Sequence, residues 1–239
     1  YEVVATARRS ESLDDLDVAE RLALDVDDDA SVAAAVESAG DLDVLVNNAG
    51  FGIAGPVEAV PIDEARRLFE TNFFGAVRMI QAVVPRMRER GTGTVVNVSS
   101  VSGRVASPLS GFYSATKFAL EAVSESLRYE VGHFGVRVVV VEPGFIETRF
   151  DDNRVMHGTD GPPYDELRAQ WEAATERLNT GPPPGPELVA ATIADAVEAD
   201  EPKLRWPVGA DADMALAARA QMDDETFEAS MRSVLGLTW

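Results

Sequence analysis

Tyr113 and Lys117, four positions apart, carry the clearest chemical pattern in this sequence. In a helix, residues i and i+4 lie on the same face, about one turn apart. An ammonium group beside a phenol favours the phenolate and lowers the pKa of a tyrosine from about 10 toward neutrality. Such a tyrosine can donate or accept a proton near pH 7. A pair on the surface of an ordinary helix has the same spacing, so the pattern needs support from other residues.

Ser100 supplies a second candidate group. It directly follows an apolar run at 94–99, which is typical of a strand. Ligands collect at the carboxyl ends of the strands of a parallel sheet. A serine hydroxyl at that edge can hold a carbonyl or alcohol oxygen in place. Ser99, one position earlier, is the alternative.

The segments that must position these groups alternate between apolar runs and amphipathic patterns of helical length. Strand-like runs occur at 2–7, 21–26, 43–50, 93–100 and 136–144, with a weaker candidate at 203–209. The runs at 44–46 and 136–141 are continuously apolar, as expected of parallel strands buried on both faces. Helical patterns cover 29–39, 61–90 and 112–135; Pro85 predicts a kink or break in the second, and 180–187 predicts a loop. This order predicts an α/β fold with a doubly wound parallel sheet.

The charge composition is unusual. The chain has 41 acidic and 21 basic residues, which gives a net charge of −20. A field of this sign repels nucleic acid phosphates and anionic membranes, so neither is an expected partner. The acidity fits either a well-solvated surface or a halophilic protein, in which salt screens the self-repulsion of the chain.

Metal sites and membrane spans are not expected. The chain has no cysteine and two histidines, which argues against thiolate and histidine-rich metal sites. Every apolar run is shorter than the roughly 20 residues that a membrane span needs. In the N-terminal stretch the arginines follow the apolar run, which is the wrong order for a signal peptide. We therefore expect a cytoplasmic protein.

Five motifs, taken in order, resemble the short-chain dehydrogenases/reductases. They are NNAG at 47–50, ETNFFG at 70–75, NVSSVSG at 97–103, YSATK at 113–117 and EPGFIETRF at 142–150. Ser100 precedes Tyr113 by thirteen residues, which is the family's spacing. The resemblance is strong up to residue 150 or so and loose beyond. It implies one Rossmann-type domain over 1–239, with a cofactor-binding and catalytic core at 1–150 and substrate-binding helices and a C-terminal tail at 151–239.

By this resemblance, the reaction is hydride transfer between a nicotinamide and a carbonyl or secondary alcohol. Tyr113 is expected to be the acid/base. Lys117 is expected to lower the pKa of that tyrosine and to bind the nicotinamide ribose. Ser100 is expected to orient the substrate oxygen, and Asn72 to hold a water that links Lys117 to solvent.

The resemblance also implies which residues contact the cofactor beside Tyr113 and Lys117. They are Asp25 and Val26 near the adenine, Asn47, Ala49 and Gly50 along the cleft wall, and Pro143, Gly144, Ile146 and Thr148 along the nicotinamide and diphosphate. Arg8 and Arg9 follow the first apolar run, where NAD-dependent sheets carry an acidic residue. Because arginine suits a 2′-phosphate, we expect NADP, with NAD as the alternative. Two merely solvated arginines would give the same sequence.

One element of the family is missing at the start of the sequence. The glycine-rich turn T-G-x-x-x-G-x-G, which cradles the diphosphate, should lie upstream of Tyr1. Family strand order places its strand in the middle of the sheet, between the runs at 2–7 and 43–47. Buried strands without that neighbour would leave unpaired backbone groups. We therefore expect the sequence to be a fragment that lacks roughly 25–30 residues.

The substrate and the assembly are less well marked. An apolar substrate is indicated by Phe145, Phe150, Met156, Tyr164 and Trp171, unless these side chains only pack the helices. Family members pair through their long helices, here 63–90 and 112–134, so a homodimer or homotetramer is expected. Two other classes stay open: a non-catalytic NAD(P)-binding sensor on this fold, and an extended-family epimerase or dehydratase. The intact Asn–Ser–Tyr–Lys set argues against the first, and NNAG with the short C-terminal lobe against the second.

Overall fold

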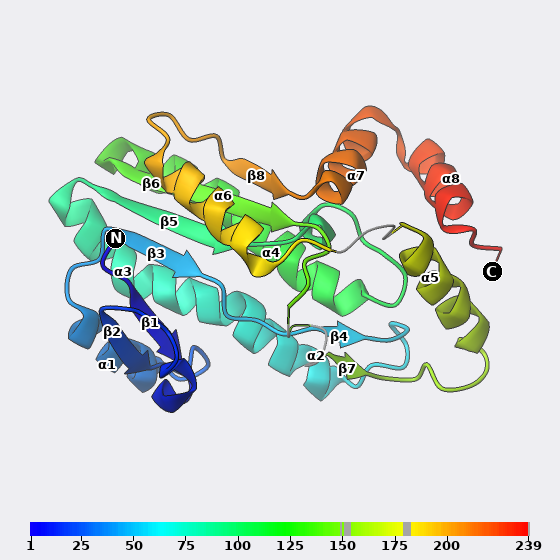
Figure 1. Ribbon diagram of the computed structural model, residues 1–239, viewed down its shortest axis with the longest axis horizontal. Coiled ribbons are helices and arrows are strands. Elements are labelled where there is room, and N and C mark those ends of the chain that lie inside the picture. Colours follow the sequence, from blue (N-terminus) through cyan, green and yellow to red (C-terminus); the bar gives the residue numbers. More distant parts are fainter. Residues whose placement is uncertain (149, 151–153, 179–182, 239) are drawn as a thin grey trace.

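The computed structural model describes residues 1–148, 150, 154–178 and 183–238, and strands and helices alternate along the chain (Figure 1). The strands are β1 (Val4–Ala7), β2 (Glu20–Ala23), β3 (Val44–Asn47), β4 (Ile53–Ala54), β5 (Gly93–Val98), β6 (Val136–Pro143), β7 (Val155–Met156) and β8 (Arg205–Val208). The α-helices are α1 (Asp29–Ala39), α2 (Ile62–Phe69), α3 (Ala76–Arg90), α4 (Gly111–Val131), α5 (Asp165–Leu178), α6 (Pro186–Glu198), α7 (Ala210–Gln221) and α8 (Asp224–Leu235). The 3₁₀ turns η1 (Ser10–Leu13), η3 (Val101–Gly103) and η4 (Gly132–Phe134) and the π-helical turn η2 (Glu70–Gly75) connect them.

All strand pairs among the described residues are parallel, and they form three sheets. The largest has the order β3-β5-β6-β8, while β1 pairs with β2 and β4 pairs with β7. The strands of the main sheet point the same way in Figure 1, so their carboxyl ends share one edge. The predicted α/β architecture with parallel strands is confirmed, including the weak candidate that became β8. β1 and β3 lie in different sheets and share no backbone pairing.

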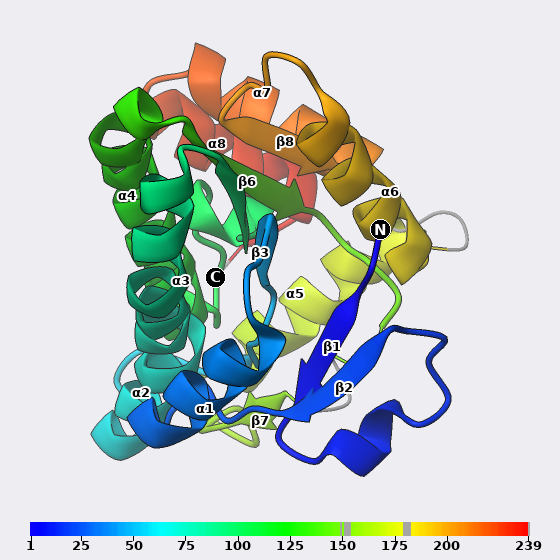
Figure 2. The ribbon, with the colours of Figure 1, turned by 90° about the vertical axis from the view of Figure 1, so that its left-hand side faces the viewer.

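Helices cover both faces of the main sheet. Figure 2 looks along the sheet, with α3 and α4 on one side and α6 on the other. Neighbouring residues of β5 serve opposite faces: Val95 packs with α1, α3 and α4, whereas Val96 packs with α6. Every residue of β5 is buried, and β6 is buried at most positions, as its continuous apolar run predicted. In β3, Val44 is only half-buried and Val46 is 42% exposed, so the prediction of burial on both faces was wrong for that strand.

The long helical pattern at 61–90 is interrupted, but not where proline predicted. The helix α3 continues through Pro85 to Arg90, and the departure from α-helix lies at Glu70–Gly75, which is wound as a π turn. The prediction of a break at Pro85 was therefore wrong. A π turn accommodates one extra residue per turn, and such turns frequently mark functional sites.

A glycine contact closes the end of the fold opposite the carboxyl edge. Gly135 follows α4 and η4 with φ of 76°, in the left-handed region that favours glycine. A Cβ at this position would overlap the carbonyl oxygen of Gly91, which itself ends α3 in the left-handed region. The helix α3 and the turn η4 after α4 therefore end on glycines that also meet each other.

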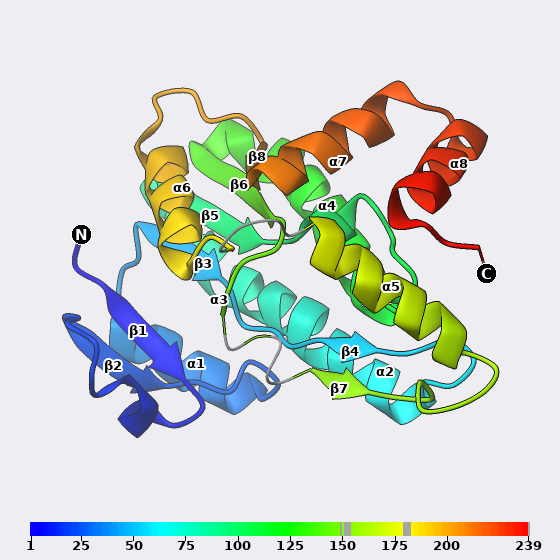
Figure 3. The same ribbon diagram turned by 45° about the vertical axis from the view of Figure 1, so that its right-hand side comes forward.

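Three helices of the C-terminal third, α5, α7 and α8, lie apart from the helices that cover the main sheet. Figure 3 shows α5, α7 and α8 together at one end of the molecule, far from β1 and β2. The predicted loop at 180–187 lies partly outside the described residues, and α6 begins within it at Pro186. None of the described helices is both long and apolar enough to cross a membrane.

Candidate active site

Asn72 joins three elements of the site. It lies in the π turn and is 1% exposed. Its Oδ1 accepts from the backbone N–H of Phe51 at 3.0 Å, and its Nδ2 donates to the carbonyl of Phe51 at 2.9 Å. The same Nδ2 donates to Thr116 Oγ1 at 3.4 Å, in the helix α4. The side chain thus ties the loop after β3 to the helix that carries Tyr113 and Lys117.

Ser100 lies at the N-cap of η3, just beyond the end of β5. Its Oγ accepts from the backbone N–H of Ser102 at 3.1 Å and donates to the carbonyl of Pro143 at 3.4 Å. The residue is half-buried, so its hydroxyl faces the carboxyl edge of the sheet. Ser99 is buried, and its Oγ has no hydrogen bond among the described residues. Of the two candidates, Ser100 is the one that a ligand can reach.

Tyr113 and Lys117 lie one turn apart near the start of α4. Lys117 Nζ is 5.9 Å from the centre of the Tyr113 ring. That ring is half-buried and packs against Phe150, with 5.6 Å between ring centres. Thr116 holds the first turn together, because its hydroxyl donates to the carbonyl of Tyr113 at 2.7 Å. The i, i+4 arrangement expected from the sequence is present.

Lys117 is the most perturbed cation of the site. It is 6% exposed, and its Nζ donates to the carbonyl of Val98, the last residue of β5, at 2.8 Å. Burial lowers the pKa of Lys117 to about 8, although the negative charge of Glu121 acts in the opposite direction. A lysine with this pKa stays mostly charged at neutral pH and deprotonates readily in mild alkali.

A buried polar chain runs under the NNAG motif. Asn47 and Asn97 face each other across β3 and β5, and Asn47 Nδ2 donates to Asn97 Oδ1 at 2.8 Å. Asn97 Nδ2 donates to Ser124 Oγ at 2.8 Å, and Ser124 Oγ donates to the carbonyl of Leu120. Because each of these side chains is buried and hydrogen-bonded, the chain fastens both strands to α4.

The stretch after β6 passes close to the start of α7. Gly144 N–H donates to the carbonyl of Val208 at 2.9 Å, and Phe145 N–H donates to Asp211 Oδ2 at 2.7 Å. A Cβ at position 144 would overlap the carboxylate of Asp211, so any other residue there would require that side chain to shift. Asp211 was not among the expected site residues, since an aspartate in the first turn of a helix has no distinguishing sequence signal.

The remaining expected cofactor residues lie along the same edge. Ala49 and Gly50 are exposed after β3, and a Cβ at Gly50 would lie 3.1 Å from Asn72 Oδ1. After β6, Pro143 and Ile146 are half-buried, whereas Thr148 is exposed.

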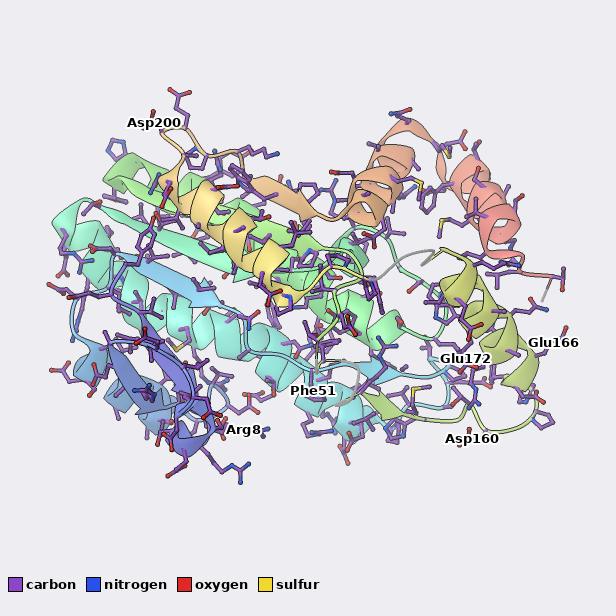
Figure 4. The ribbon with its side chains drawn as sticks, in the orientation of Figure 1. Arg8, Phe51, Asp160, Glu166, Glu172 and Asp200 are labelled. Atoms are coloured by element: carbon purple, nitrogen blue, oxygen red, sulfur yellow. The ribbon has the colours of Figure 1, made fainter. Side chains whose placement is uncertain are left out.

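The small sheet carries the adenine-side candidates. Arg8 and Arg9 are both exposed between β1 and η1, and Figure 4 labels Arg8 at the end of this sheet. Asp25 follows β2, where its Oδ1 accepts from the backbone N–H of Asp27 at 3.1 Å. Val26 packs directly on Gly75 of the π turn.

Comparison with known proteins assigns the family. The short chain dehydrogenase family model matches residues 2–157. The chain belongs to the short-chain dehydrogenase/reductase family. It is accordingly an NAD(P)-dependent oxidoreductase, as the motifs predicted.

Two curated relatives illustrate the range of the family around this chain. An uncharacterized oxidoreductase of Schizosaccharomyces pombe is 37% identical over 221 residues, which cover 90% of this chain and 92% of the relative. Human retinol dehydrogenase 8 is 35% identical over 222 residues, covering 86% of this chain and 71% of the relative.

Solved structures share the fold. A short-chain dehydrogenase from Streptomyces avermitilis has a TM-score of 0.82 and 36% identity, and the match covers 98% of this chain and 88% of that one. A short-chain dehydrogenase from Burkholderia cenocepacia in complex with NADP has a TM-score of 0.76 and 27% identity, with coverages of 100% and 87%. The 3-ketoacyl-(acyl-carrier-protein) reductase from Brucella melitensis, complexed with NADH, has a TM-score of 0.71 and 25% identity, with coverages of 86% and 85%.

The residues at the carboxyl edge fit a nicotinamide dinucleotide. The exposed guanidinium groups of Arg8 and Arg9 and the ammonium of Lys117 are cations suited to phosphate and ribose oxygens. The small, exposed residues Ala49 and Gly50 let a ligand approach the backbone closely. The donor set and the family assignment therefore agree.

Proposed function

We propose that this short-chain dehydrogenase uses NADP to interconvert a carbonyl and a secondary alcohol, with Tyr113 as the acid/base. The observation that carries the proposal is the buried Lys117 ammonium, 5.9 Å from the ring centre of Tyr113. A positive charge at that place favours the phenolate, so the tyrosine can exchange its proton near neutral pH.

The proposed roles follow from the positions of the four residues. Tyr113 Oη gives its proton to the carbonyl oxygen during reduction and takes it back during oxidation. Ser100 Oγ holds that oxygen by a hydrogen bond. The nicotinamide, when bound, donates or accepts the hydride. Lys117 keeps its charge beside Tyr113, and Asn72 keeps the π turn against α4. Because the Asn72 amide is already engaged, the relay water is proposed to bind its backbone carbonyl.

The preference for NADP rests on Arg8 and Arg9. Both follow β1 and are exposed, and no carboxylate stands between β1 and η1, where an NAD-dependent sheet would place one. A guanidinium offers two parallel hydrogen bonds to a phosphate. The NADP complex of the Burkholderia cenocepacia relative agrees with this choice, although the Brucella melitensis relative was solved with NADH.

An apolar hollow near the C-terminal helices is consistent with an apolar substrate. A cavity of about 330 Å³ lies between the loop before α4, α5 and α8. Its lining is mostly apolar and includes Pro108, Leu167, Phe227, Met231 and Leu235. Of the residues expected from sequence, Phe150 packs against Tyr113, whereas Phe145 and Met156 are exposed. The likeness to retinol dehydrogenase 8 points to the same substrate class.

Association through the long helices is part of the proposal. The helix α4 and the π turn before α3 expose large apolar side chains, among them Tyr129 at 82%, Phe74 at 47% and Phe118 at 44%. A second copy of the chain covering these residues would give a homodimer, or a homotetramer with a second interface. Sedimentation of the purified protein decides this proposal, and a monomer at micromolar concentration contradicts it.

The decisive experiment uses protein expressed from the complete gene. NADPH consumption is followed with a panel of aliphatic, steroid-like and retinoid-like ketones and aldehydes. Tyr113→Phe should abolish turnover and leave NADPH affinity within about twofold, while the control Tyr1→Phe, at an exposed site, should keep both. Tight NADPH binding without turnover on any carbonyl would instead indicate a cofactor sensor. Undiminished turnover by Tyr113→Phe would refute the assigned acid/base.

A further inference from the structure

Two carboxylates are buried behind the site, and none of the roles above uses them. Glu121 on α4 is 4% exposed, and Glu142 on β6 is 1% exposed. The Oε1 atom of each has no hydrogen bond among the described residues. Burying one carboxylate is costly, and burying two near each other adds repulsion between like charges. Such an arrangement persists only where cations offset it.

Two arginines from different parts of the chain provide those cations. Arg205 on β8 donates from Nε to Glu121 Oε2 at 2.9 Å, and the same Nε lies 3.8 Å from Glu142 Oε1. Arg104, after η3, places Nη1 3.5 Å from Glu142 Oε1. Arg205 also pairs with the half-exposed Glu125 at 2.8 Å. We call the two buried carboxylates, together with Arg104 (42% exposed) and Arg205 (26% exposed), the buried charge cluster; its members are Arg104, Glu121, Glu142 and Arg205.

The buried charge cluster touches each element that carries a reacting side chain. Glu121 lies one turn after Lys117 on the same helix, and it is the charge that opposes the effect of burial on the pKa of that lysine. Glu142 precedes Pro143, whose carbonyl accepts from Ser100 Oγ. Arg104 directly follows the turn that Ser100 caps.

The turn after Ser100 also rests directly on α4. A Cβ at Gly103 would lie 3.0 Å from Glu121 Cγ and 3.3 Å from the carbonyl carbon of Lys117. Arg104, next in sequence, therefore approaches Glu142 from a turn that packs against α4. A shift of this turn would move Ser100 relative to Lys117.

We propose that the buried charge cluster is a positioning unit for the active site, in which Glu142 and Arg104 hold the Ser100 turn on β6 and Glu121 supplies the negative charge that retains the Lys117 ammonium. The catalytic consequence rests on the proposed function. The electrostatic consequence does not, because it concerns the charge of Lys117 itself.

The cluster makes positioning dependent on pH. Burial, and next the charge of Glu121, raise the pKa of Glu142 to about 7, against the opposing effects of Arg104 and Arg205. Ionised Glu142 pairs with Arg104, and protonation near neutrality weakens that pair. Two further carboxylates lie on neighbouring elements: Glu125 on α4, paired with Arg205, and Asp211 on α7, which accepts from Phe145 N–H.

The first test measures Lys117 directly and needs no turnover. The chain contains only two lysines, Lys117 and Lys203, so ¹³Cε-lysine labelling gives two NMR signals, which Lys203→Arg assigns. Glu121→Gln should lower the titration midpoint of Lys117 by about one pH unit, because burial then acts unopposed. The matched control Glu125→Gln removes the exposed partner of Arg205 and should leave the midpoint unchanged. Equal midpoints in wild type, Glu121→Gln and Glu125→Gln would overturn the electrostatic role.

The second test follows kcat against pH with the best substrate found. In the wild type, kcat should rise through an ionisation near pH 7 as the Glu142–Arg104 pair forms. Glu142→Gln should remove that ionisation and lower kcat roughly tenfold at pH 8, with KM for NADPH nearly unchanged. Glu125→Gln should retain the wild-type profile, and melting curves of each variant confirm folding. Wild-type kcat in Glu142→Gln at pH 8 would overturn the positioning role.

The two tests also separate this inference from the proposed function. A wild-type enzyme without turnover on any carbonyl refutes the proposed function, and the Lys117 midpoints still decide the role of Glu121. If the wild type turns over a carbonyl substrate but the Lys117 midpoints are equal in all variants, the proposed function stands and the electrostatic role of Glu121 is refuted.

Discussion

Lys117 Nζ donates to the carbonyl oxygen of Val98, the final residue of β5, at 2.8 Å. This bond spans 19 residues and fixes an ammonium at the end of a central strand. Val98 carries the last backbone carbonyl of that strand, and Ser100 follows two positions later. The bond therefore holds the Lys117 ammonium at the carboxyl end of β5, the same end that Ser100 follows.

Replacing this lysine should strengthen the fold. Lys117→Met keeps an unbranched side chain one atom shorter and removes a charge whose burial lowers the pKa from 10.5 to about 8. After the loss of one hydrogen bond, we expect a net gain of about 1–2 kcal/mol, or a rise in Tm of about 2–6 °C. Calorimetry at pH 7 checks the gain, with the exposed Lys203→Met as control. A lower Tm for Lys117→Met than for the wild type contradicts it.

The free energy of unfolding should depend on pH in two windows. Between pH 4.5 and about 7, folded Glu142 holds a proton that the unfolded chain has released, so stability falls as pH rises. Between about pH 8 and 10.5, the unfolded chain holds a proton that folded Lys117 has released, so stability rises. Urea unfolding of Glu142→Gln and wild type isolates the first window. The variant should gain about 2–3 kcal/mol relative to wild type between pH 5 and pH 8; a constant difference disproves the assignment.

The close approach of Gly144 to Asp211 predicts a coupled pair. Gly144→Ala should cost about 1–3 kcal/mol, because its methyl group would overlap the Asp211 carboxylate. In an Asp211→Ala background the same substitution should cost clearly less, since the obstacle is gone. Gly132→Ala is the control, because nothing lies within 4 Å of a Cβ there and its φ is −59°. Additive effects in the double variant would argue against the contact.

Cofactor choice should depend on the arginines after β1. Arg8→Ala combined with Arg9→Ala should raise KM for NADPH by about 10-fold or more and leave KM for NADH nearly unchanged. Arg66→Ala, an exposed arginine on α2 paired with Asp63, serves as the control. Equal losses with both cofactors would mean that these arginines do not read the 2′-phosphate.

Salt should stabilise this protein. A net charge of −20 produces self-repulsion that molar salt screens within a few ångströms. Melting curves in potassium chloride from 0.1 to about 2 M should therefore move to higher temperature. A melting temperature that stays level or drops across this series would leave the acidity as a feature of surface hydration only.

Local patterns in the sequence predicted much of the fold and the placement of Tyr113 and Lys117 one turn apart in the candidate site. Tyr113 and Lys117 are about one helical turn apart, so their relative position depends on the local helix and not on distant parts of the chain. The strands β3, β5 and β6 were readable from their apolar runs, although Val46 of β3 is 42% exposed, so burial on both faces holds for β5 and most of β6 only.

Features that depend on distant partners were not predictable. The π turn at Glu70–Gly75 lies where Asn72 hydrogen-bonds to Phe51 and Thr116. The spacing of apolar residues in the sequence does not encode these contacts. The strands β4 and β7 have two residues each, too few for any pattern. Arg205 reaches Glu121 across 84 residues, and nothing near either residue announces the other.

The amide pair between Asn47 and Asn97 has a consequence for how the chain finds its fold. Val44, Leu45 and Val46 face Thr94, Val95 and Val96, and a slip of two residues would keep the same apolar faces inward. That slip would, however, separate two buried amides from each other and leave them without hydrogen bonds. The polar pair thus discriminates between registers that apolar packing alone tolerates. The candidate site is built on the segments that follow β3 and β5, so a slipped β3 would displace one of these segments while the sheet itself stayed packed.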